Sequence, residues 1–366
     1  MRILFCGDIM PGGVLSYQDQ FVSNKVLDLL SSVDFRVGTL ECAIGDDIPF
    51  DERKMSLEGG KNIVYAREED FERVKQLNIN LVTLANNHVF DLGVDGLINT
   101  IKLLDEKGIA YCGAGRNISE ASKPCLVELD GKIFAFIGCC FKGLPPKTIE
   151  LATFDKPGVF QTDEKEICQI ISQLKQEADY VIILPHWGVE YSYVPPKKCY
   201  NLAKQMIDAG ADAVIGSHTH IMNPRMTYKE KPVFFSMGNF LFPDFCLQAP
   251  RPIDYPKSRE IVYSLPIVYN YPKQVSHAVR VVWKKSSRIG VVPILDFSDT
   301  NQITNVCSFT VLDRNNVLQL LGIWGRMNET LKMAFVGNKM GALTCQIYVK
   351  LKQIYSKFKI FICAVN

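Results

Sequence analysis

The sequence predicts an α/β layered domain, and two observations support that prediction. Over residues 1–240, short apolar runs typical of strands alternate with segments whose apolar residues recur at helical spacing. The 366-residue chain, with 47% hydrophobic and 22% charged residues, has the composition of a globular protein that can bury a full core. We therefore expect one large α/β domain followed by a smaller appendage.

The expected strands are apolar, often β-branched runs bounded by glycine, proline or polar clusters. The first run, RILFCG, begins at residue 2 and ends in a glycine. The run CLVELDGKIFAFIGCC predicts a hairpin that turns at Asp130 and Gly131. The expected strand segments are 2–7, 35–41, 78–85, 125–140, 179–185, 211–216 and 231–242, with two more over 276–297.

Helices are expected where apolar residues recur every three or four positions. The segment VDGLINTIKLLDEKG ends in a lysine and a glycine, which is typical of a helix C-terminus. The expected helices cover residues 68–77, 94–108, 163–178 and 198–210. Residues 243–270 are rich in proline and predict an irregular insertion.

The C-terminal tail beyond about residue 312 predicts helices. Its last part carries Lys350, Lys352, Lys357 and Lys359 among apolar positions. Two interpretations remain open, namely a helical extension packed on the domain and a basic amphipathic surface that contacts a membrane or a partner.

Charge and cysteine content exclude several classes of protein. The net charge of +2 does not provide the basic surface that binds nucleic acid. The twelve cysteines include no CxxC pair and lie mostly in apolar runs, which predicts reduced core thiols in place of a disulfide framework or a zinc cluster. The amino terminus enters a strand-like run at once, so we expect no signal peptide and no transmembrane segment. The expected location is the cytoplasm, with partner proteins as the route to any membrane association.

The stretch AVIGSHTHIMNP, residues 213–224, places two of the five histidines one residue apart after a strand-like run. If this segment is extended, His218 and His220 point to the same side of the chain, because alternate side chains share a face. The two imidazoles could then bind one ion. An isolated pair of this kind could equally cap a strand with hydrogen bonds, so further ligands are needed to decide.

Polar side chains also follow the other predicted strands. They are Asp8, Glu41, Asn86, Asn87, His88, Asp91, His186 and Glu190, so that only His277 among the histidines lies elsewhere. If the strands are parallel neighbours, these side chains converge at one edge of the sheet. Their oxygen and nitrogen atoms suit Mn²⁺, Fe or Zn²⁺, and a bridging carboxylate such as Glu41 could hold two ions. Each residue alone is more typical of a cap or an Asx turn, so the prediction depends on the full set.

Five motifs, GDIMPGG, TLE, ANNHVFDLG, HWGVEY and GADAVIGSHTHIMNP followed by KPVFFSMGNFLF, occur in this order. Block by block they resemble the CapA family of the calcineurin-like metallophosphoesterase superfamily, which is associated with poly-γ-glutamate and capsule synthesis. The resemblance covers roughly residues 1–300, most specifically 80–100 and 183–242. It implies a β-sandwich flanked by helices over 1–300, interrupted by the irregular insertion at about 243–275. Residues 301–366 are expected to form a mainly helical C-terminal extension.

The resemblance also implies roles for the strand-end residues. Six resemble metal ligands, with Asp8 and His220 on one ion, Asn87, His186 and His218 on the other, and Glu41 as the bridge. His88 resembles the general acid, or the group that stabilises charge on a leaving oxygen, and Asp91 is expected to orient it. One or two divalent ions, Mn, Fe or Zn, are therefore the expected cofactors.

One residue departs from the wider superfamily. Met10 stands where the first motif, Asp-x-His, usually has its histidine, and a thioether is a poor ligand for a hard or borderline ion. The first metal position is therefore expected to be weak, filled by water or another side chain, or empty. Glu41 also replaces the more usual aspartate, which lengthens its reach by one methylene.

Two functions remain open at this point. The resemblance implies a divalent-metal-dependent hydrolase that cleaves a phosphoester or an amide bond of an anionic small molecule or polymer, with capsule-synthesis proteins as partners. Met10 favours the alternative, a non-catalytic metal-containing protein of capsule assembly or anionic-polymer binding. His88 with Asp91 favours the enzyme, because a binding pocket needs no oriented acid. Substrate specificity is expected in loops 46–66, 141–160 and 243–275, which carry no recognisable motif.

Overall fold

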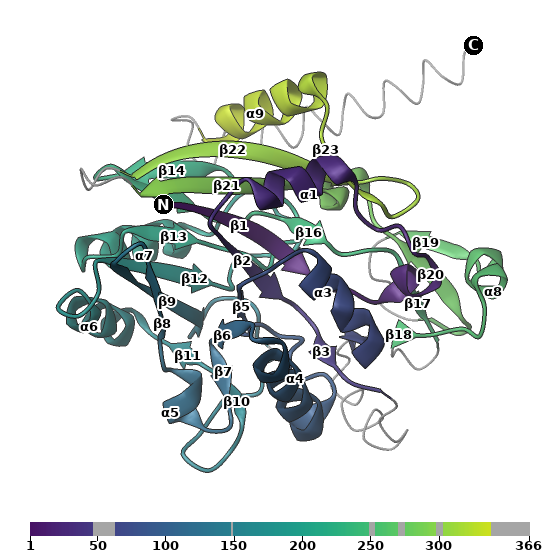
Figure 1. Ribbon diagram of the computed structural model, residues 1–366, viewed down its shortest axis with the longest axis horizontal. Coiled ribbons are helices and arrows are strands. Elements are labelled where there is room, and N and C mark those ends of the chain that lie inside the picture. The colour runs from purple at the N-terminus through teal and green to yellow at the C-terminus, as the bar shows by residue number, and fades with distance from the viewer. Residues whose placement is uncertain (47–62, 148, 249–252, 270–274, 298–302, 338–366) are drawn as a thin grey trace.

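Two β-sheets pack face to face in this chain, and helices cover their outer surfaces (Figure 1). The computed structural model describes residues 1–366 except 47–62, 148, 249–252, 270–274, 298–302 and 338–366. Both sheets contain neighbouring parallel strands. This arrangement confirms the predicted α/β class with a β-sandwich flanked by helices.

The first sheet is built around β1, which pairs in parallel with β2 and β16 and antiparallel with β21. Its strand order is β23-β22-β21-β1-β2-β5-β6, with β16 beside β1. The strands are β1 Arg2–Ile9, β2 Phe35–Leu40, β5 Leu81–Thr83, β6 Ala110–Cys112, β16 Asn239–Leu241, β21 Ile289–Phe297, β22 Ile303–Leu312 and β23 Leu318–Leu320.

The second sheet has the order β11-β9-β12-β13-β15-β14, with β8 beside β9. Strands β9, β12, β13 and β15 are parallel to one another in succession. The strands are β8 Cys125–Leu129, β9 Lys132–Phe141, β11 Gln161–Thr162, β12 Tyr180–Pro185, β13 Ala213–Ile215, β14 Arg225–Tyr228 and β15 Lys231–Phe234.

Alternate residues of the central strands divide between separate cores, because successive side chains of a strand point to opposite faces. Ile3 of β1 and Phe136 of β9 lie in the core between the sheets. Leu4 of β1 packs in the core under α1 and α4, and Ile137 of β9 packs in the core under α6 and α7. Strands buried on both faces have continuous apolar sequences, which is why they were recognisable in the sequence.

Helices pack on both outer faces of the sandwich and also at its periphery. They are α1 Asn24–Ser31, α3 Glu72–Gln76, α4 Gly93–Lys107, α5 Ile118–Ala121, α6 Glu164–Leu174, α7 Lys197–Asp208, α8 Arg259–Ser264 and α9 Ile323–Gly337. Short 3₁₀ helices are η1 Gly13–Tyr17, η2 Glu68–Phe71 and η3 Lys285–Arg288. Helix α4 ends at Gly108 with φ 66°, the left-handed stop that the lysine-glycine pair predicts.

The hairpin predicted at Asp130 and Gly131 is confirmed. Strands β8 and β9 pair antiparallel up to the contact of Leu129 with Lys132. Asp130 has φ 53° and Gly131 has φ 69°. Two successive positive φ values are typical of a type I′ turn, whose twist matches that of the flanking strands.

The described part of the segment expected to be an irregular insertion, about 243–275, instead contributes three strands to a small sheet, and the fourth strand comes from the predicted strand region 276–297. The order is β18-β17-β20-β19. The strands are β17 Phe245–Leu247, β18 Ile253–Asp254, β19 Ile267–Tyr269 and β20 Val279–Val282. The apolar residues among the prolines stabilise this order, since Phe245 and Leu247 are fully buried. Two further strand pairs are β3 Ala43–Ile44 with β4 Tyr65–Ala66, and β7 Ala114–Gly115 with β10 Gly158–Val159.

Residues 303–320, expected to be mainly helical, form β22 and β23 of the first sheet. Strand β22 pairs with β21 from Phe297 opposite Ile303 to Ile289 opposite Val311. Among the described residues beyond 302, the first helix is α9, Ile323–Gly337. The boundary between a main domain and a C-terminal extension stays a prediction. Because β22 and β23 belong to the first sheet, we now expect that boundary beyond β23. Residues 338–366, including the four lysines of the amphipathic interpretation, lie outside the described residues.

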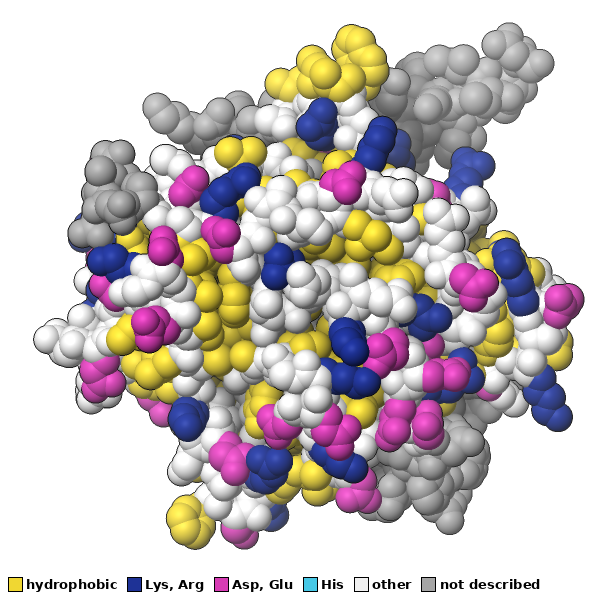
Figure 2. Space-filling model, viewed as in Figure 1, with side chains coloured by type: hydrophobic (Ala, Val, Ile, Leu, Met, Phe, Trp, Pro, Cys, Tyr) yellow, Lys and Arg dark blue, Asp and Glu magenta, His cyan; other side chains and the backbone are white. Residues whose placement is uncertain are grey.

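Helix α9 leaves hydrophobic side chains on the surface at the top of the molecule (Figure 2). The exposed residues are Ile323, Trp324, Met327 and Leu331. This helix and the other described helices are too short or too polar to traverse a bilayer. The ten described cysteines are free thiols and most are buried, whereas Cys345 and Cys363 lie outside the described residues.

Candidate metal centre

The carboxyl ends of strands from both sheets bring the six predicted metal ligands into one buried cluster. They are Asp8 near the end of β1, Glu41 after β2, Asn87 after β5, His186 after β12, and His218 and His220 after β13. All six side chains are buried, and the most exposed, Asn87, is only 6% accessible. The structure therefore places the predicted residues together, as the parallel strand ends led us to expect.

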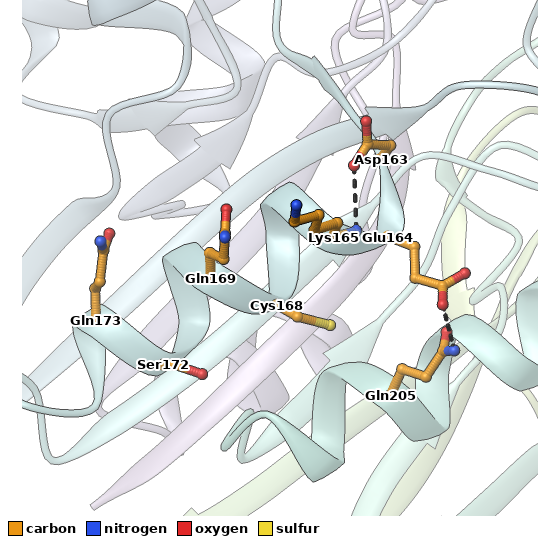
Figure 3. Close-up of a pocket in the computed structure, with 8 residues that line it drawn as sticks. All are labelled: Asp163, Glu164, Lys165, Cys168, Gln169, Ser172, Gln173 and Gln205. Carbon is orange, nitrogen blue, oxygen red and sulfur yellow. Dashed lines mark hydrogen bonds between the residues drawn. The ribbon is translucent and has the colours of Figure 1, made fainter.

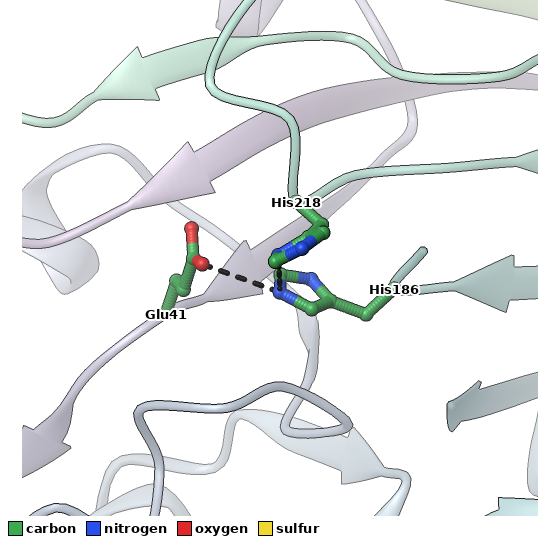
Figure 4. Close-up of side chains that lie close together, drawn as sticks. All are labelled: Glu41, His186 and His218. Atoms are coloured by element: carbon green, nitrogen blue, oxygen red, sulfur yellow. Dashed lines mark hydrogen bonds and ion pairs between the residues drawn. The ribbon is translucent and has the colours of Figure 1, made fainter. Parts of the chain in front are cut away.

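Glu41, His186 and His218 offer ligand atoms that all lie within 4.8 Å of one another (Figure 4). His186 Nε2 lies 3.2 Å from Glu41 Oε1 and 3.1 Å from His218 Nδ1. Asn87 Oδ1 lies 3.0 Å from the same His186 nitrogen. Atoms that each bind one ion at about 2.0–2.2 Å lie roughly 3.0–3.5 Å apart. The spacing around His186 therefore fits a position with four protein ligands.

Asp8, Glu41 and His220 form a second group whose ligand atoms lie within 4.8 Å of one another. His220 Nδ1 lies 3.7 Å from Asp8 Oδ2 and 3.7 Å from Glu41 Oε2. Glu41 belongs to both groups, since its Oε1 faces His186 and its Oε2 faces His220. A carboxylate placed in this way can bridge two ions a few ångströms apart.

The Asp8 and Glu41 carboxylates are poorly satisfied by the described part of the chain. All four oxygens of Asp8 and Glu41 are buried, and none accepts a well-formed hydrogen bond there. Burying an unpaired carboxylate costs several kilocalories per mole in principle. A divalent cation would satisfy these oxygens, and carboxylate, amide and imidazole ligands without thiolates suit Mn²⁺, Fe or Zn²⁺. The residues therefore fit one or two such ions.

Burial also controls the charge states of the cluster. It raises the pKa of Asp8 well above the ordinary range, with the neighbouring Glu41 as the next cause, and it raises the pKa of Glu41 to about 6. Burial lowers the pKa of His186 and of His218, so these imidazoles are neutral at pH 7 and keep a lone pair for an ion. For His220, burial disfavours the charge, but the Glu41 and Asp8 carboxylates outweigh it and raise the pKa.

His218 and His220 reach the two ligand groups through turns of the backbone, not through an extended segment as expected. The prediction that they share one face of an extended segment is wrong, because β13 ends at Ile215 and both histidines have positive φ, 97° for His218 and 55° for His220. These turns direct His218 to one ligand group and His220 to the other. A positive φ in a non-glycine residue costs on the order of 1–3 kcal/mol and is typical of functional sites.

Polar residues outside the predicted set hold two of the imidazoles. Ser217 Oγ lies 2.9 Å from His186 Nδ1, and Asn239 Oδ1 lies 2.9 Å from His220 Nδ1. The amide nitrogen of Asn239 in turn donates to the Ser287 carbonyl at 2.9 Å. Such partners orient ligand side chains. The sequence analysis missed them, although Ser217 adjoins the histidine pair and Asn239 lies in the motif KPVFFSMGNFLF.

His88 and Asp91 form a buried pair, as predicted. His88 Nδ1 lies 2.6 Å from Asp91 Oδ2, and that oxygen also accepts a hydrogen bond from the Val64 backbone at 2.7 Å. The carboxylate is therefore fixed from two sides, and it fixes the imidazole ring in turn.

The Asn-Asn-His turn combines both interpretations that its sequence allows. Asn86 Oδ1 accepts hydrogen bonds from the backbone N–H groups of His88 at 2.9 Å and Val89 at 2.8 Å, which makes an Asx turn. Asn87 is left to reach His186 Nε2. One asparagine shapes the loop and the next joins the ligand cluster.

Met10 is fully buried and packs in the hydrophobic core with residues of the first sheet. The second ligand group therefore consists of Asp8, Glu41 and His220 among the described residues. It has fewer protein ligands than the group around His186.

An aromatic wall that the sequence analysis missed surrounds His220. The ring centroids of Phe242, Trp283 and Tyr191 lie 5.3, 5.5 and 5.8 Å from that of His220. Burial raises the pKa of Tyr191 above its ordinary range, so its hydroxyl keeps the proton at neutral pH. Tyr191 is the last residue of the motif HWGVEY, and its place in that motif was the one sequence feature that could have indicated a position near the site.

A depression along α6 and α7 is a weaker candidate (Figure 3). Its lining residues are Asp163, Glu164, Lys165, Cys168, Gln169, Ser172, Gln173 and Gln205. Asp163 caps α6 by accepting the N–H groups of Lys165 and Glu166, and Glu164 accepts from Gln205. Asp163 and Glu164 are thus engaged in helix capping and in a contact between the two helices, so we place the chemistry at the strand-end cluster.

The chain is similar in sequence to bacterial proteins of capsule synthesis. A family model described as "Bacterial capsule synthesis protein PGA_cap" matches residues 2–244, a range that includes all six predicted ligands, His88 and Asp91. "Capsule biosynthesis protein CapA" of Bacillus anthracis is 32% identical over 252 residues, 66% of this chain and 60% of that protein. "PGA biosynthesis protein CapA" of Bacillus subtilis (strain 168) is 30% identical over 248 residues, 65% of this chain and 62% of that protein.

The matched region spans less than two thirds of the length of either relative. Among solved structures, a hypothetical protein from Thermus thermophilus aligns with a TM-score of 0.47 at 14% identity, covering 88% of this chain and 100% of that chain.

Proposed function

We propose that this chain, which belongs to the bacterial capsule synthesis protein family PGA_cap, is a divalent-metal-dependent hydrolase that acts in capsule or poly-γ-glutamate biosynthesis. The observation that carries the proposal is a buried pair of ligand groups that share Glu41, next to the His88–Asp91 pair. We take the substrate to be an anionic small molecule or polymer with a phosphoester bond to be cleaved, or an amide bond. Capsule-synthesis proteins are the partners we propose.

The ligand assignment follows the two groups. Glu41, Asn87, His186 and His218 would hold one ion, and Asp8, Glu41 and His220 would hold the other. Bound there, Mn, Fe or Zn ions supply Lewis-acid polarisation of the substrate and acidify a water molecule. The buried carboxylates of Asp8 and Glu41 would balance the ionic charge, and the neutral imidazoles of His186 and His218 would be further ligands.

His88 is assigned as the general acid. It donates a proton to the leaving oxygen or nitrogen as the bond to that atom breaks. Asp91 holds Nδ1 at 2.6 Å, so it fixes the tautomer and stabilises the imidazolium form, and we assign proton transfer to the other ring nitrogen. Asp91 acts through His88 and is therefore a positioning residue.

A second candidate function is a metal-containing protein that binds an anionic polymer, or takes part in capsule assembly, without turnover. The buried Met10 favours it, because the group of Asp8, Glu41 and His220 then has three protein ligands and a weaker hold on its ion. The oriented His88 favours the hydrolase.

The test compares wild type with His88→Asn on generic phosphomonoester, phosphodiester and γ-glutamyl amide substrates, with added Mn²⁺ or Zn²⁺. We expect turnover of at least one class that chelator abolishes and metal restores. Removal of a general acid is expected to lower kcat by about 10²–10⁴. The matched control is His277→Asn, since His277 is exposed and lies outside the cluster.

Bound metal is measured on the same samples. Equal metal content in wild type and His88→Asn, with turnover lost in the variant alone, supports the hydrolase. Stoichiometric metal with no turnover of any class by wild type puts the binding function first.

A further inference from the structure

Tyr191 lies directly on a predicted metal ligand. Its ring stacks on His220 with centroids 5.8 Å apart and an angle of 29° between the planes. The centroid of the Trp283 ring lies 6.4 Å from that of Tyr191. The Tyr191 ring is thus held against the cluster by its neighbours.

The backbone at Tyr191 is strained, and hydrogen bonds hold it in this conformation. Its φ of 59° lies in the left-handed region, which is uncommon for a bulky aromatic residue. The Tyr191 N–H donates to the carbonyl of Thr219 at 2.9 Å, and Thr219 lies between His218 and His220. The next residue, Ser192, is tied by its carbonyl to the Asn223 amide at 2.8 Å. Backbone strain of this kind is concentrated at functional sites, so Tyr191 is a candidate functional residue.

The Tyr191 hydroxyl is buried, and no described residue forms a hydrogen bond with it. Most buried polar groups have a partner, and leaving one without costs about 1–3 kcal/mol. This cost would be removed if a molecule bound at the ligand cluster accepted a hydrogen bond from the Tyr191 hydroxyl.

We propose that the Tyr191 hydroxyl donates a hydrogen bond to an anionic oxygen of the ligand held at the metal centre, which makes Tyr191 a specificity-determining residue. The inference rests on the proposed function, because it takes the strand-end cluster as the substrate site. A protonated phenol is a neutral hydrogen-bond donor, so it complements the negative oxygens of a phosphoryl or carboxylate group.

The test is Tyr191→Phe, which keeps the ring on His220 and removes only the hydroxyl. The full-length protein, loaded with Mn²⁺, is titrated calorimetrically with inorganic phosphate and separately with glutarate. We expect the affinity for at least one anion to fall about tenfold, the size of effect typical of a lost hydrogen bond to a charged group. Mn²⁺ content and the thermal midpoint are expected to stay at the wild-type values.

The matched control is Tyr228→Phe, which removes a hydroxyl that bonds Asp208 at 3.3 Å on the surface. It should leave both affinities unchanged. A loss confined to phosphate identifies a phosphoryl group as the acceptor, and a loss confined to glutarate identifies a carboxylate.

The inference is overturned if Tyr191→Phe binds both anions with wild-type affinity. It is also overturned if the wild type binds neither phosphate nor glutarate. Lost Mn²⁺ in the variant also overturns it, because the hydroxyl would then serve the metal site. Turnover of the substrate panel is measured in parallel. Weakened anion binding without any wild-type turnover refutes the hydrolase alone, whereas normal turnover with unchanged anion affinity refutes this inference alone.

Discussion

Glu41→Gln tests the shared ligand through the pH dependence of stability. Glu41 is fully buried, and burial raises its pKa from 4.5 to about 6. In metal-free protein, a carboxyl group whose folded-state pKa is raised stabilises the fold fully below its unfolded pKa, and that contribution disappears as the pH rises through the folded-state pKa. The difference between 4.5 and about 6 corresponds to about 2 kcal/mol of unfolding free energy.

The variant keeps the shape of the side chain and cannot ionise. In EDTA at pH 7.5 we expect Glu41→Gln to exceed the wild type by about 2 kcal/mol in unfolding free energy, and we expect the difference to disappear as the pH falls toward 4.5. With saturating Mn²⁺ the order should reverse at pH 7.5. The wild type then has its complete ligand set, and an ion that binds the folded state stabilises it.

The assay is urea unfolding followed by tryptophan fluorescence from pH 4.5 to 8, in EDTA and in Mn²⁺. Glu230→Gln is the control, since Glu230 is exposed and outside the cluster. The reasoning is refuted if metal-free wild type gains stability over Glu41→Gln as the pH rises, because Glu41 would then be more stable as a carboxylate in the folded protein.

Two further predictions concern the ligands and the end of the first sheet. Alanine at His186 or at His218 is expected to weaken Mn²⁺ binding at least tenfold, and unchanged metal content after dialysis, measured by inductively coupled plasma mass spectrometry, would exclude the site. A chain that ends after residue 312 loses β23 with Leu318, which is fully buried and bonds the Phe21 carbonyl. We expect its thermal midpoint to fall, because an emptied leucine site costs about 2–5 kcal/mol, and an unchanged midpoint would mean that β23 adds nothing to stability.

Much of the fold was predictable because its central strands are buried on both faces. The run RILFCG predicts β1, since both faces of that strand meet apolar cores and the sequence is continuously hydrophobic. Strand β22 was missed for the opposite reason. Four of the ten residues in its sequence ITNVCSFTVL are polar, and Val306 is 64% exposed, so pairing with β21 decides its conformation more than its own pattern does.

The resemblance to the CapA family is confirmed by the family match, whereas the roles of individual site residues stay proposals. The loop that carries His218 and His220 shows why part of the site was beyond prediction. Alternation along an extended chain is a local rule, but the positive φ values of His218 and His220 are set by the loop's contacts with its surroundings. Ser217 and Asn239 were missed for the same reason, since an isolated Ser or Asn carries no information about which imidazole it will face.

The identity of the chemical groups at the strand ends was readable from the chain, because a buried strand must be apolar and the first polar residues after it are easy to recognise. The approach of the two Glu41 oxygens to His186 and His220, and of the Tyr191 ring to His220, depends on tertiary packing. The ligands come from strands of two different sheets, so their distances depend on how the sheets pack, and that packing is a property of the whole core.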